Sequence, residues 1–372
     1  GAVPPQLLEF SPVTSSDHSL PSRTPLSTRV IGAADIAAIL RTVGRDAFMD
    51  LMISALRERF ESFDAGEVQA RERDGFRYDK PDLGLLEWMP THELSGPVVV
   101  KMVGYHPTNP VQRRLPSVIA TSAMWDTTSG HLVALGDATL LTSIRTGAAS
   151  AVATDVLARP GPATVGVIGL GTQAVTQVHA ISRVRPIEKV IGLDTNAEVA
   201  DTFADRIAFL GLDVEIDDSR RAASIVSDVD VLCTCTSVDI GAGPVVGEAT
   251  PRPWLHVNAV GADFPGKVEL PTSLLGQALV VPDVRSQCRL EGECQQIPES
   301  QIGPELWELL QRPSGPATGQ VTVFDSTGWA VEDDAALRLA HRLALEHDVG
   351  SDMILEGISV DPYDPYSPLL GT

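Results

Sequence analysis

Cysteine is scarce in this sequence of 372 residues, which contains only Cys233, Cys235, Cys288 and Cys294. Four cysteines are too few for a disulfide scaffold in a chain of this length, and their spacings do not match a zinc ribbon or a zinc finger. We therefore expect all four to be packing residues, and we expect no metal site.

Long apolar runs and positive charge are also lacking. No stretch of about eighteen apolar residues predicts a membrane-spanning helix, and no basic segment followed by an apolar one indicates a secretory signal. The chain has 28 Lys and Arg against 49 Asp and Glu, and its net charge of −21 repels nucleic acid and anionic membranes. We expect a cytoplasmic protein that binds neither.

Several catalytic signatures are missing as well. The sequence has no G-x-S-x-G elbow, no H-E-x-x-H helix and no phosphate-binding P-loop. Serine hydrolase, zinc protease and nucleoside triphosphatase activities therefore have no support.

The first part of the chain predicts helices followed by a sheet. Residues 1–29 are rich in Pro, Ser and Thr, and we expect a poorly ordered arm there. Helical spacing extends from Ala33 to about Phe63. Short strand-like runs separated by turn residues follow at 83–90, 97–105, 117–125 and 130–136, which indicates an antiparallel sheet. A helix over 138–159 completes this part.

A domain boundary is predicted at "RPGP", residues 159–162, where strands begin to alternate with helices. The predicted strands are 164–171, 189–196, 212–217, 230–237, 255–261, 278–283 and 321–326. Several are apolar without alternation, as expected for parallel strands covered on both faces. The last helical pattern, from residue 331, is predicted to return to the first domain.

A glycine motif follows the first of these strands. In "TVGVIGLGTQA", Gly169, Gly171 and Ala174 form a G-x-G-x-x-A pattern between a strand and a helix, where backbone N–H groups can approach a pyrophosphate. The next strand ends at Asp194, whose carboxylate can accept both ribose hydroxyls and would repel a 2′-phosphate. The sequence therefore predicts bound NAD, the alternative being that the glycines only tighten a turn.

Two further strand ends carry polar residues at the edge where ligands bind in parallel sheets. Thr236 and Ser237 could line the cofactor or cap the next helix. Asp263, in "HVNAVGADFPGK", could face the nicotinamide or act only as a helix cap, and the residues alone leave both interpretations open.

Charged residues inside apolar strands of the first domain need partners, because an unpaired buried charge is costly. Lys101 lies in "VVVKMV" and Glu87 in "LLEWM". They could form a structural ion pair with each other. Alternatively, Lys101, Arg145 and an arginine before the first strand could bind a substrate carboxylate, while Glu87 and Asp263 bind amino groups. Acids and bases in one cleft indicate an amino acid substrate.

The chain resembles the ornithine cyclodeaminase and mu-crystallin superfamily from about Val30 to the tail, and within it the bacterial lysine cyclodeaminases. The matching segments are "GFRYDKPDLGLLEWMP", "KMVGYHPTNP", "LTSIRTGAASAVA", "GLGTQAVTQVHA", "HVNAVGADFPGKVELP", "RLEGECQQ", "VFDSTGWAVED" and "DPYDPYS". "ALGDATLLT" departs from the usual Asp-Gly order of the family.

This resemblance implies roles for individual residues. Arg73, Lys101 and Arg145 match the positions that bind the substrate carboxylate, with Arg77 as an alternative to Arg73. Glu87 matches an acid near the substrate amine, and Asp263 matches the catalytic aspartate, so that Asp263, Glu87 and Lys101 are the predicted catalytic residues. The predicted cofactor-binding residues are Gly169, Gly171, Thr172, Gln173, Asp194, Thr195, Ser117, Arg145, Thr236, Ser237, Asn258 and Val260.

The resemblance also implies a fold and a reaction. We expect an α/β protein with a Rossmann-type NAD-binding domain, 159–330, and an α+β domain for substrate binding and dimerisation, 30–158 with 331–372, built on an antiparallel sheet. NAD would take a hydride from a diamino acid and return it after ring closure, giving L-pipecolate from lysine or L-proline from ornithine, with loss of ammonia. The alternatives are an imine reductase or amino acid dehydrogenase of the same superfamily, and a crystallin-like binding protein. Family members dimerise through the antiparallel sheet, so a homodimer is expected.

Overall fold

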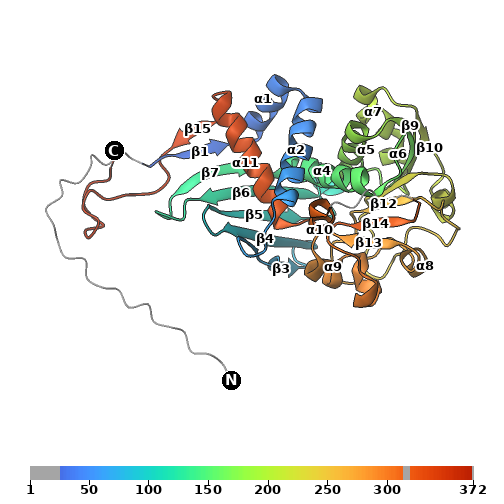
Figure 1. The fold of residues 1–372 in the computed structure, drawn as a ribbon. Helices are drawn as coiled ribbons and strands as arrows, with labels where there is room; N and C mark the ends of the chain where they lie inside the picture. Colours follow the sequence, from blue (N-terminus) through green and yellow to red (C-terminus); the bar gives the residue numbers. More distant parts are fainter. Residues whose placement is uncertain (1–25, 313–318, 371–372) are drawn as a thin grey trace.

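The computed structural model describes residues 26–312 and 319–370. It contains two sheets side by side, with the long helix α4 between them (Figure 1). Its strands are β1 (Thr28–Ile31), β2 (Val68–Ala70), β3 (Asp74–Tyr78), β4 (Gly84–Glu93), β5 (Val98–Tyr105), β6 (Val118–Trp125), β7 (Leu132–Asp137), β8 (Ala163–Ile168), β9 (Ile187–Leu193), β10 (Val214–Ile216), β11 (Val231–Thr234), β12 (His256–Ala259), β13 (Leu279–Pro282), β14 (Thr322–Asp325) and β15 (Ser351–Met353). Its α-helices are α1 (Ala33–Val43), α2 (Arg45–Glu61), α3 (Asn109–Arg113), α4 (Thr139–Leu157), α5 (Thr172–Val184), α6 (Ala197–Asp201), α7 (Phe203–Arg206), α8 (Thr272–Leu275), α9 (Arg285–Glu291), α10 (Leu306–Gln311) and α11 (Ala330–Glu346).

The first sheet has the order β15-β1-β7-β6-β5-β4-β2, with β3 paired to β4. Its central strands are antiparallel, as predicted, but β1 runs parallel to β7, a pairing that the three helices and five strands between them in the chain make possible. The sheet is therefore mixed. Figure 1 shows α1, α2 and α11 on one face of it.

The second sheet confirms the seven predicted strands. All are parallel, in the order β10-β9-β8-β11-β12-β14-β13. Small residues bring the helix between the sheets close to its neighbour: a Cβ on Gly147 of α4 would lie 2.5 Å from the carbonyl oxygen of Thr176 in α5. This packing fixes α4, and with it Arg145, against the second sheet.

The first and last strands of the described chain, β1 and β15, both lie in the first sheet. Of the predicted arm, residues 1–25 lie outside the described residues, whereas Thr28 and Arg29 already pair in β1, so the predicted boundary at residue 29 is too late. At the other end, Leu337 of α11 packs on Val99 of β5, and β15 pairs with β1. The division at 159 and 331 stays a prediction.

The four cysteines are all unpaired, and Cys233, Cys288 and Cys294 are buried, which agrees with a packing role. Across the described parts of the chain, no helix is long and apolar enough to cross a membrane. Nor do those parts contain a group of three or more His, Cys, Asp or Glu side chains that could hold a metal ion.

Candidate active site

The glycine loop between β8 and α5 leaves open space in front of the helix. Gly171 is the N-cap residue of α5 and provides no side-chain cap, so the first-turn N–H groups are available for an anion. A Cβ on Gly171 would meet nothing within 4 Å. Gly169 differs, with a φ of +86° and a virtual Cβ 2.8 Å from the carbonyl oxygen of Cys235. The loop therefore has the shape that a pyrophosphate requires.

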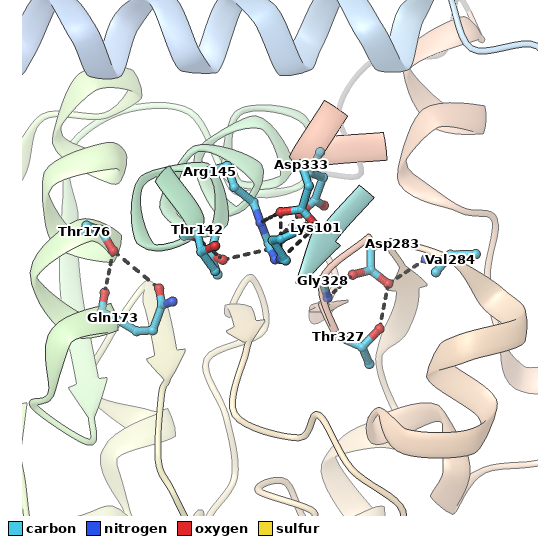
Figure 2. Close-up of polar contacts among 12 residues, drawn as sticks. Lys101, Thr142, Arg145, Gln173, Thr176, Asp283, Val284, Thr327, Gly328 and Asp333 are labelled. Carbon is cyan, nitrogen blue, oxygen red and sulfur yellow. Dashed lines mark hydrogen bonds and ion pairs between the residues drawn. The ribbon is translucent and has the colours of Figure 1, made fainter. Parts of the chain in front are cut away.

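Asp194 lies beside this loop, directly after β9. Its Oδ2 accepts a hydrogen bond from the Leu170 N–H at 2.7 Å and its Oδ1 accepts one from the Asn196 N–H at 2.8 Å. A carboxylate has about four acceptor positions, so it can still accept the ribose hydroxyls. Thr195 and Thr172 are exposed nearby, and Gln173 in the first turn of α5 is half-buried (Figure 2).

Substitutions at the two glycines provide a matched test of the proposed cofactor cradle, the glycine loop between β8 and α5. Gly171→Ala should fold like the wild type, because its φ is −74° and the methyl meets no protein atom, yet it should weaken NAD binding about tenfold or more by filling the cradle. Gly169→Ala should instead lower the melting temperature, since a non-glycine residue at positive φ costs about 1–2 kcal/mol. Thermal melts with NAD titrations check this, and normal NAD binding by Gly171→Ala would contradict the cradle.

One strand-end prediction needs correction. The Thr236 N–H and Oγ1 both donate to Oε1 of Glu269, each at 2.7 Å. In the described chain, no helix begins between Thr236 and β12. The interpretation of Thr236 and Ser237 as helix caps is therefore wrong. Asn258 is fully buried and donates to Thr154 Oγ1 of α4 at 3.0 Å, because strand alternation directs it toward that helix. Its side chain is therefore bonded to α4, and a part for Asn258 in cofactor binding stays a prediction.

The remaining predicted cofactor residues keep places compatible with their role. Val260, half-buried, follows β12, and its N–H bonds to the carbonyl of Thr234 at 3.0 Å. Ser117 directly precedes β6 and accepts a backbone hydrogen bond from His106 at 2.8 Å. Neither position has a described ligand contact, so both stay predictions.

Asp263 lies in the turn beyond β12 and is not a helix cap, because the next helix, α8, begins only at Thr272. Its Oδ1 accepts a hydrogen bond from Lys267 Nζ at 2.8 Å, and its side chain is 41% exposed. The interpretation of Asp263 as a helix cap is therefore wrong. The other interpretation stands, in which its carboxylate is accessible to a ligand.

Arg73 connects β4 of the first sheet with α9 beside the second sheet, near Asp263. Its Nε lies 2.7 Å from Oε1 of Glu291 in α9, and its Nη1 lies 3.5 Å from Oε2 of Glu87 in β4. Its Nη2 donates to the carbonyl oxygens of Thr327 and Gly328. Arg77 lies over the turn that carries Asp263, with its guanidinium 4.7 Å from the ring centroid of Phe264, but in the described chain it forms no ion pair with these acids. Arg73 is therefore the arginine of the acid cluster.

Burial changes the proton affinity of these acids. Desolvation, with the nearby Glu87 and Asp263 carboxylates, outweighs Arg73 and raises the pKa of Glu291 to about 8. Burial likewise raises the pKa of Glu87 above its usual value, although Arg73 opposes the shift. Glu291 can therefore bind a proton close to neutral pH, and Glu87 binds one more readily than a free glutamate does.

Lys101 and Arg145 form a second, deeper part of the cluster (Figure 2). Lys101 Nζ donates to Asp333 Oδ1 at 2.8 Å. Arg145 Nε donates to the same Asp333 oxygen at 2.9 Å, and its Nη1 donates to Glu332 Oε2 at 2.9 Å. The proposed Lys101–Glu87 ion pair is wrong, because the strand register places Met89 opposite Lys101 and α11 supplies Asp333 instead.

Comparison with known proteins identifies the family. Residues 35–348 match the model of the ornithine cyclodeaminase/mu-crystallin family. The chain belongs to this family. It is 44% identical to the L-lysine cyclodeaminase of Streptomyces rapamycinicus over 346 residues, which cover 92% of this chain and 100% of that protein.

Solved structures of the ornithine cyclodeaminase/mu-crystallin family share the fold. A lysine cyclodeaminase structure on recognition of L-lysine, L-ornithine and L-2,4-diaminobutyric acid matches with a TM-score of 0.87 and 41% identity, covering 92% of this chain and 99% of that chain. An archaeal alanine dehydrogenase dimer with bound NAD matches with a TM-score of 0.77 and 30% identity, covering 88% and 99%. The predicted superfamily and α/β fold class are confirmed.

Sequence reasoning missed several acids of this cyclodeaminase-family cluster. Glu291, Glu332 and Asp333 were not predicted, nor was Asp283, whose Oδ2 accepts a hydrogen bond from the Gly328 N–H at 2.8 Å (Figure 2). A signal was available in the run of acids at the start of α11 and in "RLEGECQQ". Those acids had no partner that the sequence itself could identify.

Proposed function

We propose that this protein is an NAD-dependent cyclodeaminase that converts a basic L-amino acid, preferably L-lysine, into a cyclic amino acid with release of ammonia. The observation that carries this proposal is the excess of carboxylates around the predicted substrate-binding cations. Four cations lie among six acids there: Arg73, Lys101, Arg145 and Lys267 against Glu87, Asp263, Asp283, Glu291, Glu332 and Asp333. A diamino acid has one more ammonium than carboxylate, so its net positive charge would offset part of this excess.

The glycine loop would bind the pyrophosphate of NAD, and Asp194 the ribose. When bound, NAD supplies the hydride acceptor for the substrate α-carbon and the hydride donor for the closed ring. The chain itself orients the substrate. Arg73, Lys101 and Arg145 would bind its carboxylate, and the acids that already surround these cations keep their side chains fixed.

The acids would handle the protons of the two amino groups. Asp263 is accessible and would accept a proton from the side-chain ammonium, because only the neutral amine is a nucleophile. Glu87 and Glu291 lie within the same group of charges and would hold the second ammonium. The elevated pKa of Glu291 also allows it to carry a proton near neutral pH.

Catalytic NAD⁺ with L-lysine provides the test of function. We expect ammonia and L-pipecolate without accumulation of NADH. Stoichiometric NADH would instead support the second candidate, an amino acid dehydrogenase, which the similarity to alanine dehydrogenase favours. Activity with lysine, ornithine and 2,4-diaminobutyrate would rank three substrates, each one methylene shorter than the one before. In an apolar pocket, one methylene changes the free energy of binding by about 1–3 kcal/mol.

By resemblance alone, we place the enzyme in cytoplasmic secondary metabolism.

We also propose that the enzyme is a homodimer joined through the first sheet. The face opposite α11 exposes Leu86, Met102 and Ile119 by 42%, 40% and 44%, and the strand pairing brings them together on adjacent strands β4, β5 and β6. Exposed apolar patches of this kind mark interaction surfaces. A second copy would cover the same face by two-fold symmetry.

Charge placed on this face should separate the subunits. We expect Met102→Asp to sediment as a monomer, since pairing would bury an uncompensated carboxylate. Leu345→Asp is the matched control, because Leu345 is 53% exposed on α11, away from the sheet. Analytical ultracentrifugation decides, and a Met102→Asp dimer as stable as the control would contradict the proposed interface.

A further inference from the structure

The turn that carries Asp263 also contains a buried lysine. Lys267 is 6% exposed, and its Nζ donates to Asp263 Oδ1 at 2.8 Å. In the described part of the chain, Asp263 is the one carboxylate that forms an ion pair with it. A lysine without function would extend into solvent, because burying an ammonium is costly.

Both sheets fix the position of this ammonium. Its Nζ lies 5.4 Å from the ring centroid of Tyr105, at the end of β5 in the first sheet, a distance typical of a cation–π contact. The side-chain amide of Gln295, in the short 3-10 helix Glu293–Gln296 that follows α9 beside the second sheet, accepts from the Gly266 N–H at 2.7 Å and donates to the Lys267 carbonyl at 3.1 Å. The lysine is therefore held through both its backbone and its side chain.

The geometry leaves half of the Asp263 carboxylate for a ligand. Lys267 occupies Oδ1, whereas Oδ2 has no hydrogen bond or ion pair within residues 26–312 and 319–370. The charged and titratable groups around this pair are mostly acidic: Tyr105 of β5, Asp239 of the loop after β11, Glu269 beyond the turn, Glu87 of β4, Glu291 of α9 and the cation Arg73. Lys267 is the cation that directly contacts Asp263.

We propose that Lys267 is a positioning residue for the cyclodeaminase reaction: its buried ammonium aligns the Asp263 carboxylate and offsets the repulsion from the surrounding acids. This inference rests on the proposed function. One oxygen of Asp263 is held by Lys267, and the other is presented to the side-chain amine of the substrate. Without the ammonium, the Asp263 carboxylate would lose the cation that directly contacts it and would be free to rotate.

Lys267→Met tests this role, because methionine preserves the apolar length and removes the charge. We expect kcat/KM for L-lysine to fall about tenfold to a hundredfold at neutral pH, as for a misaligned catalytic group. The acidic limb of the kcat/KM profile should also move to higher pH by about one unit, the usual effect of losing a neighbouring cation. NAD binding should not change.

The matched control is Lys189→Met, which removes a lysine paired with Glu215 at the outer edge of the second sheet. It should keep the wild-type profile. An acidic limb that stays in place in Lys267→Met, or a loss explained entirely by weaker NAD binding, would overturn the proposal.

Lys267→Arg retains the charge and covers the case in which the methionine variant does not fold. Its acidic limb should match the wild type, and a limb displaced by one unit would equally overturn the role. Absence of ammonia release by the wild type with every diamino acid would reject the proposed function itself, which separates the two failures.

Discussion

Asp263→Asn should lower the rate of ammonia release from L-lysine by about 10²–10⁴-fold, the range for loss of a general base. Asparagine has the same shape, but its amide cannot accept the proton of the side-chain ammonium. NAD binding should persist, because Asp263 lies beyond β12, while the cofactor cradle is formed by the loop between β8 and α5. Ammonia release and NAD titration on the same preparation measure both effects.

Asp213→Asn provides the control for Asp263→Asn. Asp213 is an exposed aspartate just before the edge strand β10, so its replacement should leave turnover unchanged. If Asp263→Asn turned over at the wild-type rate, Asp263 would not be the base. If it lost NAD binding as well as activity, the aspartate would have a structural role instead.

Arg145→Met should lower the free energy of unfolding by about 3–5 kcal/mol, because removing one partner of a buried ion pair leaves charge uncompensated. Arg145 is 4% exposed and is bonded to both Glu332 and Asp333. Its loss would leave Lys101 as the one cation bonded to these two acids in the described chain. Urea unfolding measures the change.

The pH dependence of this loss identifies its cause. Burial already raises the pKa of Glu332, and removing Arg145 would raise it further. A carboxyl group whose pKa is raised in the folded protein stabilises the fold at every pH below the pKa it has in the unfolded chain. This stabilisation disappears as the pH rises through the pKa of the folded state. The deficit of Arg145→Met should therefore be smaller at pH 5 than at pH 8.

Arg342→Met is the control for Arg145→Met. It removes an exposed ion pair with Glu346, in which the two side chains are 53% and 48% exposed. Its effect should stay within about 0.5 kcal/mol, as for most surface pairs. Equal losses in the two arginine variants would contradict the idea that the Arg145 network is a buried, mutually dependent cluster.

The cofactor loop could be predicted because its signals are local. Gly169, Gly171 and the strand before them lie within a few residues, and Asp194 follows the next strand of the same sheet. The conformations agree with this pattern, since Gly169 has a positive φ while Gly171 leaves open space. Apolar runs between turn residues likewise predicted the seven strands, several of them without alternation, and all seven are parallel.

The charge cluster could not be predicted because its partners are distant in sequence. Lys101 and Asp333 are separated by 232 positions. The choice of Glu87 as the partner of Lys101 relied on proximity in sequence, whereas the strand register and α11 decide the pairing. Glu291 was missed because its pKa depends on burial beside Arg73.

The proposed reaction requires that the hydrogen removed from C2 of the substrate returns to the same carbon. L-Lysine deuterated at C2, incubated with the enzyme and catalytic NAD⁺, tests it by mass spectrometry of the product. We predict cyclic product that retains the deuterium at C2 in ordinary water. Loss of that deuterium to the solvent, or equal turnover by protein freed of NAD, would contradict the claim.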